Sequence, residues 1–237
     1  MPNVSFATLG RQQGLLQELQ VVANNLANSS TTGYKADRAI FSELVVPVGG
    51  PDGSVSLGAL SAHAFELEQG GLKPTQGQFD LAIQGEGFFQ IETPQGNRLT
   101  RAGNFQLSNT GTLVDAQGNP VLNEGGAPIL IPDDVSEISF AQDGTLSLDG
   151  EQTGRVGIFR TDGQLVRDTS TYFETTGAVT QIDDPIVIQG ALETSNVTPV
   201  LEVARMIEVQ RAYEAGQTLL EQEDQRLSQL VQTIRDR

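Results

Sequence analysis

Residues that could do chemistry are few and widely scattered in this chain. There is one histidine, His63, and no cysteine, so disulfides, thiolate nucleophiles and a zinc site of Cys and His lack the residues they need. Gly85-Glu86-Gly87 lacks the third glycine of a dinucleotide-binding fingerprint, and no G-x-S-x-G nucleophile elbow occurs. We therefore interpret His63 as a structural or surface residue and predict no catalytic residue, no cofactor and no metal site.

The acidic pairs and the glycosylation sequons have simpler explanations than chemistry. Asp133-Asp134 and Asp183-Asp184 could bind a hard cation, but neither has the spacing of an EF-hand, and solvated acidic turns explain them better. A carboxylate pair for glycoside cleavage can be found in any chain with 30 acidic residues. The sequons at Asn3, Asn28 and Asn196 stand at expected helix boundaries and are interpreted as helix caps.

Charge is distributed unevenly over the 237 residues. The net charge is −16, and residues 46–189 carry 13 of the excess negative charges, so both ends are nearly neutral. This acidity makes nucleic acid and anionic lipid poor partners, although it could serve solubility alone. No apolar run approaches the roughly 20 residues of a membrane span. Met1–Leu19 has neither the basic start nor the apolar stretch of a cleavable signal peptide.

The N-terminal segment, residues 4–28, has the pattern of an amphipathic helix, possible as one strand of a coiled coil. Its apolar residues recur at spacings of four, three and four: Leu15, Leu19, Val22 and Leu26. The polar run 28–33 should end the helix. Gly10 and Gly14 each cost about 1 kcal/mol relative to alanine. A single helix of this length and composition is marginal in water, so it needs a partner.

The middle of the chain, residues 35–190, predicts a β domain. Short apolar or alternating stretches recur at Asp80–Ile83, Gly87–Thr93, Asn104–Leu107, Ile129–Ile131, Glu137–Ala141, Arg155–Thr161 and Pro185–Ile188. Turn signals such as Gln95-Gly96 and Asp149-Gly150 separate them, which is typical of an antiparallel sandwich or irregular barrel. With no tryptophan, the core must be mainly Leu, Ile, Val and Phe. The segment Pro47–Gly58 is interpreted as a linker or loop.

The C-terminal segment predicts a helix of about 35 residues, roughly 50 Å long. Thr198 could cap it, Pro199 would take its first position and Glu202 would lie in its first turn. Most of its apolar residues follow a seven-residue repeat: Val200, Val203, Ile207, Tyr213, Leu220, Leu227, Val231 and Ile234. Because such a helix is seldom stable by itself, its natural companion is the N-terminal helix.

The predicted fold is therefore α+β. It has N- and C-terminal α-helices pairing as a coiled-coil-like domain and a central, mostly antiparallel β domain. The expected boundaries are 1–34 for the N-terminal helix, 35–190 for the β-rich domain and 191–237 for the C-terminal helix.

Three groups of segments, in order along the chain, resemble the bacterial flagellar rod and hook proteins. The segments are Val22–Asn28 with Thr32–Lys35, then Gly85–Phe89 with Thr100–Phe105 and Gly111–Val114, then Gly190–Val197 with Met206-Ile207 and Gln210–Glu214. Within that family, the compact length and residues 44–50 are more similar to a proximal rod protein than to its distal rod paralogue. The distal protein shares the Gln210–Glu214 motif, so the distal assignment remains an alternative.

The resemblance implies a structural, non-enzymatic subunit of the flagellar basal-body rod in the periplasmic space. It implies export by the flagellar type III apparatus without a cleaved leader. The implied partners are other rod subunits, both proximal and distal, and copies of the chain itself. In this family the terminal helices of neighbouring subunits form the inner wall of a hollow shaft that transmits torque, with the β domain outside.

The marginal terminal helices fit this mechanism, because segments that fold only on burial can be threaded unfolded and gain stability in the polymer. The expected assembly interface comprises Leu15, Leu19, Val22, Asn24, Asn25, Leu26, Asn28, Ile207, Arg211, Tyr213, Leu220 and Leu227. Two alternatives stand beside it. The apolar residues could pack only within one chain, and the three asparagines could simply cap and end the helix.

Two rival functions come from other classes. A secreted carbohydrate-active enzyme should have paired acids in an aromatic-lined cleft, yet aromatic residues make up only 5% of the chain. An adhesin or other surface-binding module would not need amphipathic helices at both ends.

Overall fold

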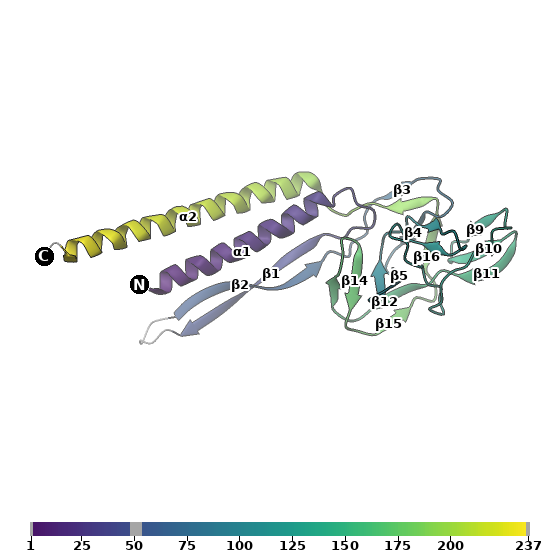
Figure 1. Cartoon of the computed structure of the whole chain (residues 1–237), viewed down its shortest axis with the longest axis horizontal. Coiled ribbons are helices and arrows are strands. Elements are labelled where there is room, and N and C mark those ends of the chain that lie inside the picture. The colour runs from purple at the N-terminus through teal and green to yellow at the C-terminus, as the bar shows by residue number, and fades with distance from the viewer. Residues whose placement is uncertain (1, 48–53, 236–237) are drawn as a thin grey trace. The chain divides into compact units, whose positions relative to one another are not determined.

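The computed structural model describes residues 2–47 and 54–235, which form two compact units (Figure 1). One unit comprises Met1–Ala27, Asp37–Ala64 and Thr198–Arg237, and the other comprises Asn28–Ala36 and Phe65–Val197. The first holds both helices and the second is built from antiparallel strands, so the α+β class is confirmed. The sequence placed residues 37–64 in the β domain, whereas in the structure they group with the helices.

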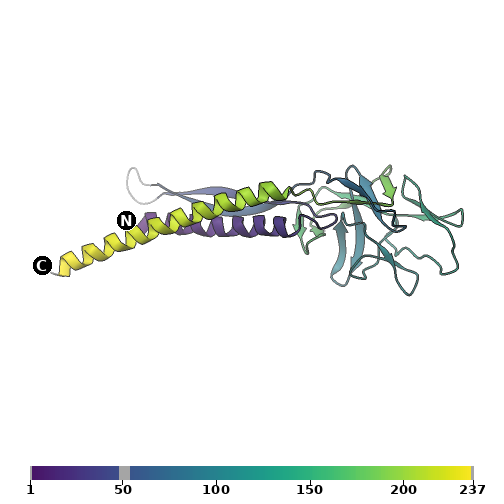
Figure 2. The same cartoon turned by 90° about the horizontal axis from the view of Figure 1, so that it is seen from above.

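The helical unit is built on α1 (Pro2–Ala27) and α2 (Pro199–Arg235). They run antiparallel and side by side, as Figures 1 and 2 show, and they contact each other. Helix α2 begins at Pro199 as predicted, where the Thr198 carbonyl accepts the Leu201 and Glu202 N–H groups. The coiled-coil character of the helix pair stays a prediction.

Strands β1 (Asp37–Pro47) and β2 (Ser54–Phe65) pair in a two-stranded sheet, and β1 contacts α1. The linker interpretation of 47–58 is wrong at both of its ends, because Pro47 closes β1 and Ser54 opens β2. Residues 48–53 lie outside the described residues. The sequence missed β2 because Gly58 and the preceding glycines and prolines outweighed the alternating Ser54–Leu57 pattern.

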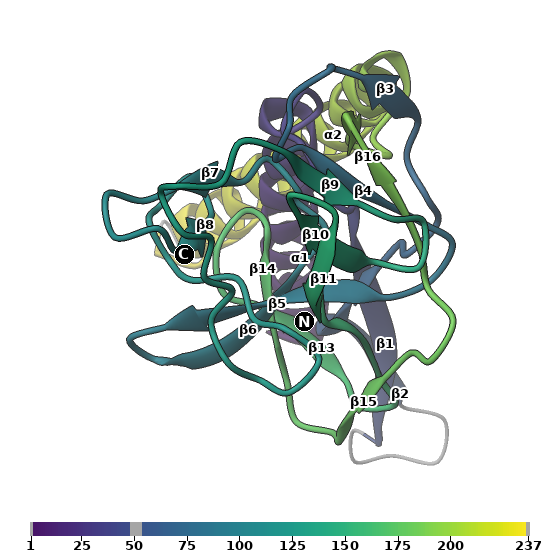
Figure 3. The same ribbon diagram turned by 90° about the vertical axis from the view of Figure 1, so that its right-hand side faces the viewer.

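The β-rich unit holds one large sheet and several small ones (Figure 3). The six-stranded sheet has the order β13 (Leu165–Arg167), β14 (Tyr172–Thr175), β6 (Gly96–Thr100), β5 (Phe88–Thr93), β12 (Ile158–Thr161) and β15 (Val179–Gln181). A three-stranded sheet joins β11 (Glu151–Arg155), β10 (Thr145–Leu148) and β9 (Ile138–Phe140). The remaining strands pair as β16 (Ile186–Gln189) with β4 (Leu81–Gln84), β17 (Ala191–Glu193) with β3 (Leu72–Pro74), and β7 (Gln106–Leu107) with β8 (Leu113–Val114).

Local turn chemistry explains several of these pairings. Leu148 pairs with Glu151, so Asp149 and Gly150 form a two-residue hairpin loop with φ of 48° and 86°. Both central residues of such a loop need positive φ, which Asp-Gly supplies, and the predicted turn is confirmed. The segment Ile129–Ile131, expected to be a strand, forms only an isolated bridge through Leu130.

The core of the β-rich unit is aliphatic with a few phenylalanines, as the composition predicted. Its fully buried side chains include Leu81, Ile83, Phe89, Ile91, Leu113 and Ile158. Each such side chain contributes about 1.5–3 kcal/mol when it is removed from water. Phe89 and Phe105 meet edge to face, with ring centroids 5.0 Å apart.

Gly103 allows two backbone segments of this core to approach closely. The Gly103 carbonyl accepts the Leu81 N–H at 2.9 Å, and a Cβ added at Gly103 would lie 1.7 Å from the Leu81 carbonyl oxygen. Because Leu81 is completely buried, its backbone cannot move aside without disturbing the core. Only glycine fits at this position.

Replacing Gly103 with alanine should therefore lower the free energy of unfolding by about 3 kcal/mol or more, the upper range of overpacking in a core. Gly154→Ala is the control, since a Cβ there meets nothing within 4 Å, and its effect should stay within about 0.5 kcal/mol. Urea unfolding followed by circular dichroism measures both variants. Similar losses in the two would contradict this account of Gly103.

Candidate functional site

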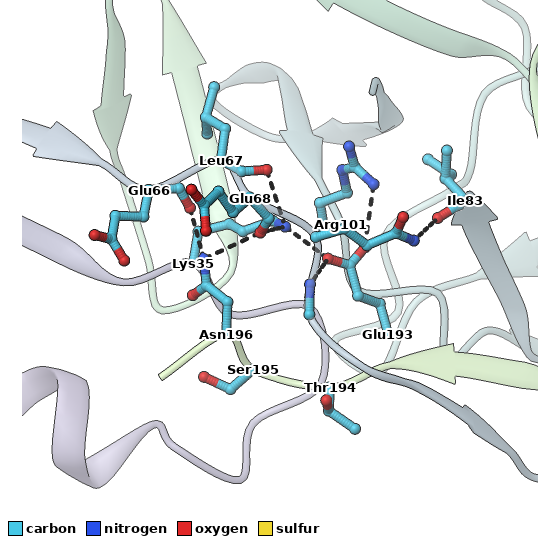
Figure 4. A network of polar contacts seen from close by, with 12 residues as sticks. Lys35, Glu66, Leu67, Glu68, Ile83, Arg101, Glu193, Thr194, Ser195 and Asn196 are labelled. Atoms are coloured by element: carbon cyan, nitrogen blue, oxygen red, sulfur yellow. Dashed lines mark hydrogen bonds and ion pairs between the residues drawn. The ribbon is translucent and has the colours of Figure 1, made fainter. Parts of the chain in front are cut away.

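Three charged side chains from distant parts of the chain meet inside the β-rich unit (Figure 4). Glu193 accepts the Lys35 Nζ on Oε1 at 2.6 Å and the Arg101 Nη1 on Oε2 at 3.1 Å. Their side chains are 1%, 0% and 3% exposed, respectively. We call Lys35, Arg101 and Glu193 the ionic cluster.

Backbone groups satisfy much of the remaining hydrogen-bonding capacity of the ionic cluster. Lys35 Nζ also donates to the carbonyl oxygens of Glu68 at 2.8 Å and Leu67 at 3.4 Å, so all three ammonium donors have acceptors. The Gly70 N–H donates to Glu193 Oε1 at 3.0 Å. Arg101 Nη2 donates to the Gly85 carbonyl at 2.7 Å.

The electrostatics of the ionic cluster depend on its one carboxylate. Burial lowers the pKa of Lys35, and the hydrogen bond and charge of Glu193 oppose that shift, while the nearby Arg101 adds to it. Burial likewise lowers the pKa of Arg101, again against Glu193. Two buried cations thus share one anion, and Glu193 stabilises the charged form of both.

Gly33 allows the backbone of Thr32–Lys35 to lie close to the ionic cluster. The Gly33 N–H donates to the Glu193 carbonyl at 2.8 Å. Gly33 has φ of +68°, and a Cβ there would lie 2.3 Å from the Ala102 nitrogen. The residue therefore needs both the left-handed conformation and the absence of a side chain.

Asn196, shortly before α2, hydrogen-bonds the backbone of two other segments of the β-rich unit. Its Oδ1 accepts the Ala36 N–H at 2.7 Å, and its Nδ2 donates to the carbonyls of Glu66 at 2.8 Å and Glu68 at 3.1 Å. The interpretation of Asn196 as a helix cap is wrong. The side chain lies three residues before α2 and bonds loop backbone instead.

Arg167 closes this region with aromatic contacts. Its guanidinium carbon lies 4.4 Å from the ring centroid of Tyr34, 4.8 Å from Phe65 and 4.9 Å from Phe173. Its Nη2 donates to the Lys35 carbonyl. Cation–π contacts at desolvated sites of this kind stabilise by up to about 2 kcal/mol.

The ionic cluster is enclosed, so it offers no reacting atom to a substrate and acts as a structural tie. Sequence reasoning missed it, because Lys35, Arg101 and Glu193 were considered only as parts of the motifs that resemble the family. A usable signal was present, since each is a charge flanked by small or apolar residues and the signs are complementary.

In the helical unit, polar contacts connect α1 with α2 and with β1. Gln12 Nε2 donates to the Tyr213 carbonyl at 2.9 Å, and Arg205 Nη2 pairs with Glu18 Oε1 at 2.9 Å. Asn25, 3% exposed, exchanges two 2.9 Å hydrogen bonds with the Asp37 backbone. Asn25 therefore ties the helix to the strand that follows it.

The residues predicted to form the assembly interface lie in several different environments. Val22 and Asn25 are buried. Half-buried members are Leu15, Leu19, Leu26, Asn28, Tyr213 and Leu220, and exposed members are Asn24, Ile207 and Arg211. Asn28 falls in the β-rich unit, where its Oδ1 accepts the Thr31 hydroxyl. The side chain of Leu227 lies outside the described part of the structure.

The first turns of α2 carry a second apolar face that α1 does not cover. The face toward α1 is marked by Glu202, which meets Asn25, and by the buried Val209. Val200, Val203 and Ile207 are 77%, 42% and 46% exposed. At 100° per residue, these three lie roughly 130° around the helix axis from the α1-facing side. We call them the apolar stripe.

Other candidates from the sequence lie at the surface. His63 is exposed, with its Nδ1 3.1 Å from Asp37 Oδ2. The acidic pairs 133–134 and 183–184 are exposed as well. No helix within residues 2–47 and 54–235 is long and apolar enough to cross a bilayer.

Removing the carboxylate of the ionic cluster should be strongly destabilising. Glu193→Gln leaves two buried cations without an anion, and we expect the free energy of unfolding to fall by about 3–5 kcal/mol. Glu92→Gln, at an exposed position of β5, should change it by less than about 0.5 kcal/mol. Chemical denaturation of both variants provides the measurement, and a small loss for Glu193→Gln would refute a central structural role.

Comparison with known proteins matches three family models to this chain. Residues 8–35 match the "Flagella basal body rod protein" model, residues 82–148 the "Flagellar hook protein FlgE/F/G D1 domain", and residues 188–233 the "Flagellar basal body rod FlgEFG protein C-terminal". Each matched segment contributes one member of the ionic cluster, namely Lys35, Arg101 and Glu193. The cluster therefore unites the three parts by which the family is recognised.

Relatives extend the match over nearly the whole chain. The flagellar basal-body rod protein FlgF of Caulobacter vibrioides is 39% identical over 91% of this chain and 91% of its own. FlgF of Mesorhizobium japonicum is 33% identical over 99% and 98%, respectively. The rod protein FlgG of Bacillus subtilis is 33% identical over 95% and 97%. The chain therefore belongs to the flagellar basal-body rod protein family and is of the FlgF type.

Proposed function

We propose that this chain is a structural subunit of the proximal part of the flagellar rod and polymerises through faces of its terminal helices. Its relatives are named rod proteins, and most of each helix falls in a segment that matches a rod model. The observation that carries the proposal is the apolar stripe on α2. A place in the distal rod is the second candidate, favoured by the similarity to FlgG.

The apolar stripe has the character of a helix-packing surface. Helices with apolar residues on two faces are normally covered on both. On α1, Leu9 and Leu16 are 54% and 50% exposed, and their seven-residue spacing puts them on one side of the helix. The occupant we assign to the stripe is the α1 of a neighbouring subunit, either another copy or a related rod protein.

The distribution of charge along the chain favours contact between the terminal segments of neighbouring subunits over contact between their β-rich units. The terminal segments are almost neutral, while residues 46–189 carry most of the net charge of −16. Negative bodies repel one another at close range. Assembly through the helices does not require those bodies to touch.

The low intrinsic stability of the two helices suits export of the chain in an unfolded state. Helix α1 contains Gly10 and Gly14, each costing about 1 kcal/mol relative to alanine. Much of α2 beyond Leu220 is exposed, so little burial holds it. Such segments suit passage through the flagellar type III apparatus into the periplasmic rod without a cleaved leader.

A charge in the apolar stripe should block assembly without unfolding the chain. We expect Ile207→Asp to abolish swimming and basal bodies with complete rods when it replaces the wild-type gene in the native host. Ala215→Asp introduces the same residue at an exposed α2 position outside the stripe and should leave both intact. Swimming-halo assays and electron microscopy of purified basal bodies give the readout. Normal rods in the Ile207→Asp strain would contradict the assignment of the apolar stripe to subunit contact.

The helices of the isolated chain should open far more readily than the β-rich unit. In dilute solution we expect the amides of α1 and α2 to exchange with deuterium at least about 100-fold faster than those of β5, because local opening needs little free energy where few apolar contacts are lost. Strand β5 is the internal control. Equal protection of helices and strand in a monomeric sample would contradict folding on assembly.

A further inference from the structure

We propose that a polar pocket in the β-rich unit binds a protonated amine or a guanidinium group. The pocket has a volume of about 230 Å³. Its walls come from the loop after α1, from β6, from the loop after β8 and from the start of β14. The assembly proposal does not use this pocket, so an experiment that contradicts one of the two proposals leaves the other unaffected.

The lining of the pocket is rich in oxygen atoms and carries one sign of charge. Hydroxyl groups come from Thr32, Thr100 and Thr171, and a carboxylate comes from Asp115. Asp115 is 5% exposed. No lysine, arginine or histidine is among the lining residues. A positive group entering the pocket would therefore meet an uncompensated negative charge in a partly dehydrated place, where Coulomb attraction is strong.

Several oxygen atoms gather at the floor of the pocket. Asp115 Oδ1 accepts the backbone N–H groups of Gln117 and Asn119, both at 2.9 Å. The Tyr172 hydroxyl lies within hydrogen-bond distance of Asp115 Oδ2 and of Gln117 Oε1. It also accepts the Asn119 amide at 3.1 Å. One phenol proton cannot serve two acceptors, and Gln117 is exposed, so its Oε1 can accept a hydrogen bond from a ligand or from water.

The Thr171 hydroxyl makes no hydrogen bond within residues 2–47 and 54–235. Thr171 is 6% exposed and lines the pocket, and its oxygen is not among the enclosed side-chain atoms that lack a partner, so solvent reaches it. A hydroxyl accepts as well as donates, so a donor group bound in the pocket can use it as an acceptor.

Cationic nitrogen groups fit this lining better than other ligands. An ammonium offers three donors and no acceptor, and a guanidinium offers five. Anions would be repelled by Asp115, and a neutral polyol would gain nothing from the Asp115 charge. The group could reach the pocket on a free small cation or as the basic side chain of a second copy of this chain.

The test is a titration of the full chain at low salt with Nα-acetyl-arginine amide, followed by the backbone amide resonances of Gln117 and Asn119. We expect saturable shifts with this probe and none with the neutral Nα-acetyl-glutamine amide. Thr171→Val removes a hydroxyl that bonds nothing in the chain, so folding should persist. It should raise Kd by about fivefold, the effect of one modest hydrogen bond.

Thr180→Val, at an exposed position of β15, is the matched control and should leave Kd unchanged. The proposal is overturned by a lack of saturation with the arginine amide, by equal shifts with the glutamine amide, or by equal Kd in the two threonine variants. Sedimentation of the chain with and without the probe separates the sources. A loss of self-association assigns the pocket to a basic side chain of a second copy, and unchanged sedimentation assigns it to a free cation.

Discussion

The bond between the Glu193 carboxylate and its two cations is the interaction on which the rest of this structure depends. It joins residues that are 158 and 92 positions apart in the chain. It lies where the segment following α1 and the segment preceding α2 run beside each other, held also by Gly33 and Asn196. The two connections to the helices therefore leave the β-rich unit from one shared point.

A buried ion pair is a costly way to obtain stability alone, because dehydrating the charges offsets most of their attraction. Apolar residues of similar size would often hold the segments equally well. What the charges add is selectivity, since a misplaced strand would leave Lys35 or Arg101 buried without an anion. The apolar core of the β-rich unit supplies the stability, and the ionic cluster supplies the unique arrangement of the three segments.

Features governed by neighbouring residues were predictable from the sequence, whereas features governed by distant pairing were not. Pro199 marks the start of α2, and Asp149-Gly150 marks a hairpin loop, because their backbone preferences act locally. The partnership of Lys35 with Glu193 depends on a fold that brings them together, which no spacing reveals. The seven-residue repeat that includes Ile207 identifies an apolar face of α2 but not which neighbour covers it.

The apolar stripe also limits the kind of assembly that it can support. Completing the burial of three partly exposed aliphatic side chains contributes a few kcal/mol, at about 1.5–3 kcal/mol for each fully transferred residue. Bringing two proteins together costs an estimated 4–15 kcal/mol in lost freedom alone. One stripe therefore cannot hold an isolated dimer. The proposed polymer removes this difficulty, because each subunit then engages several neighbours at once.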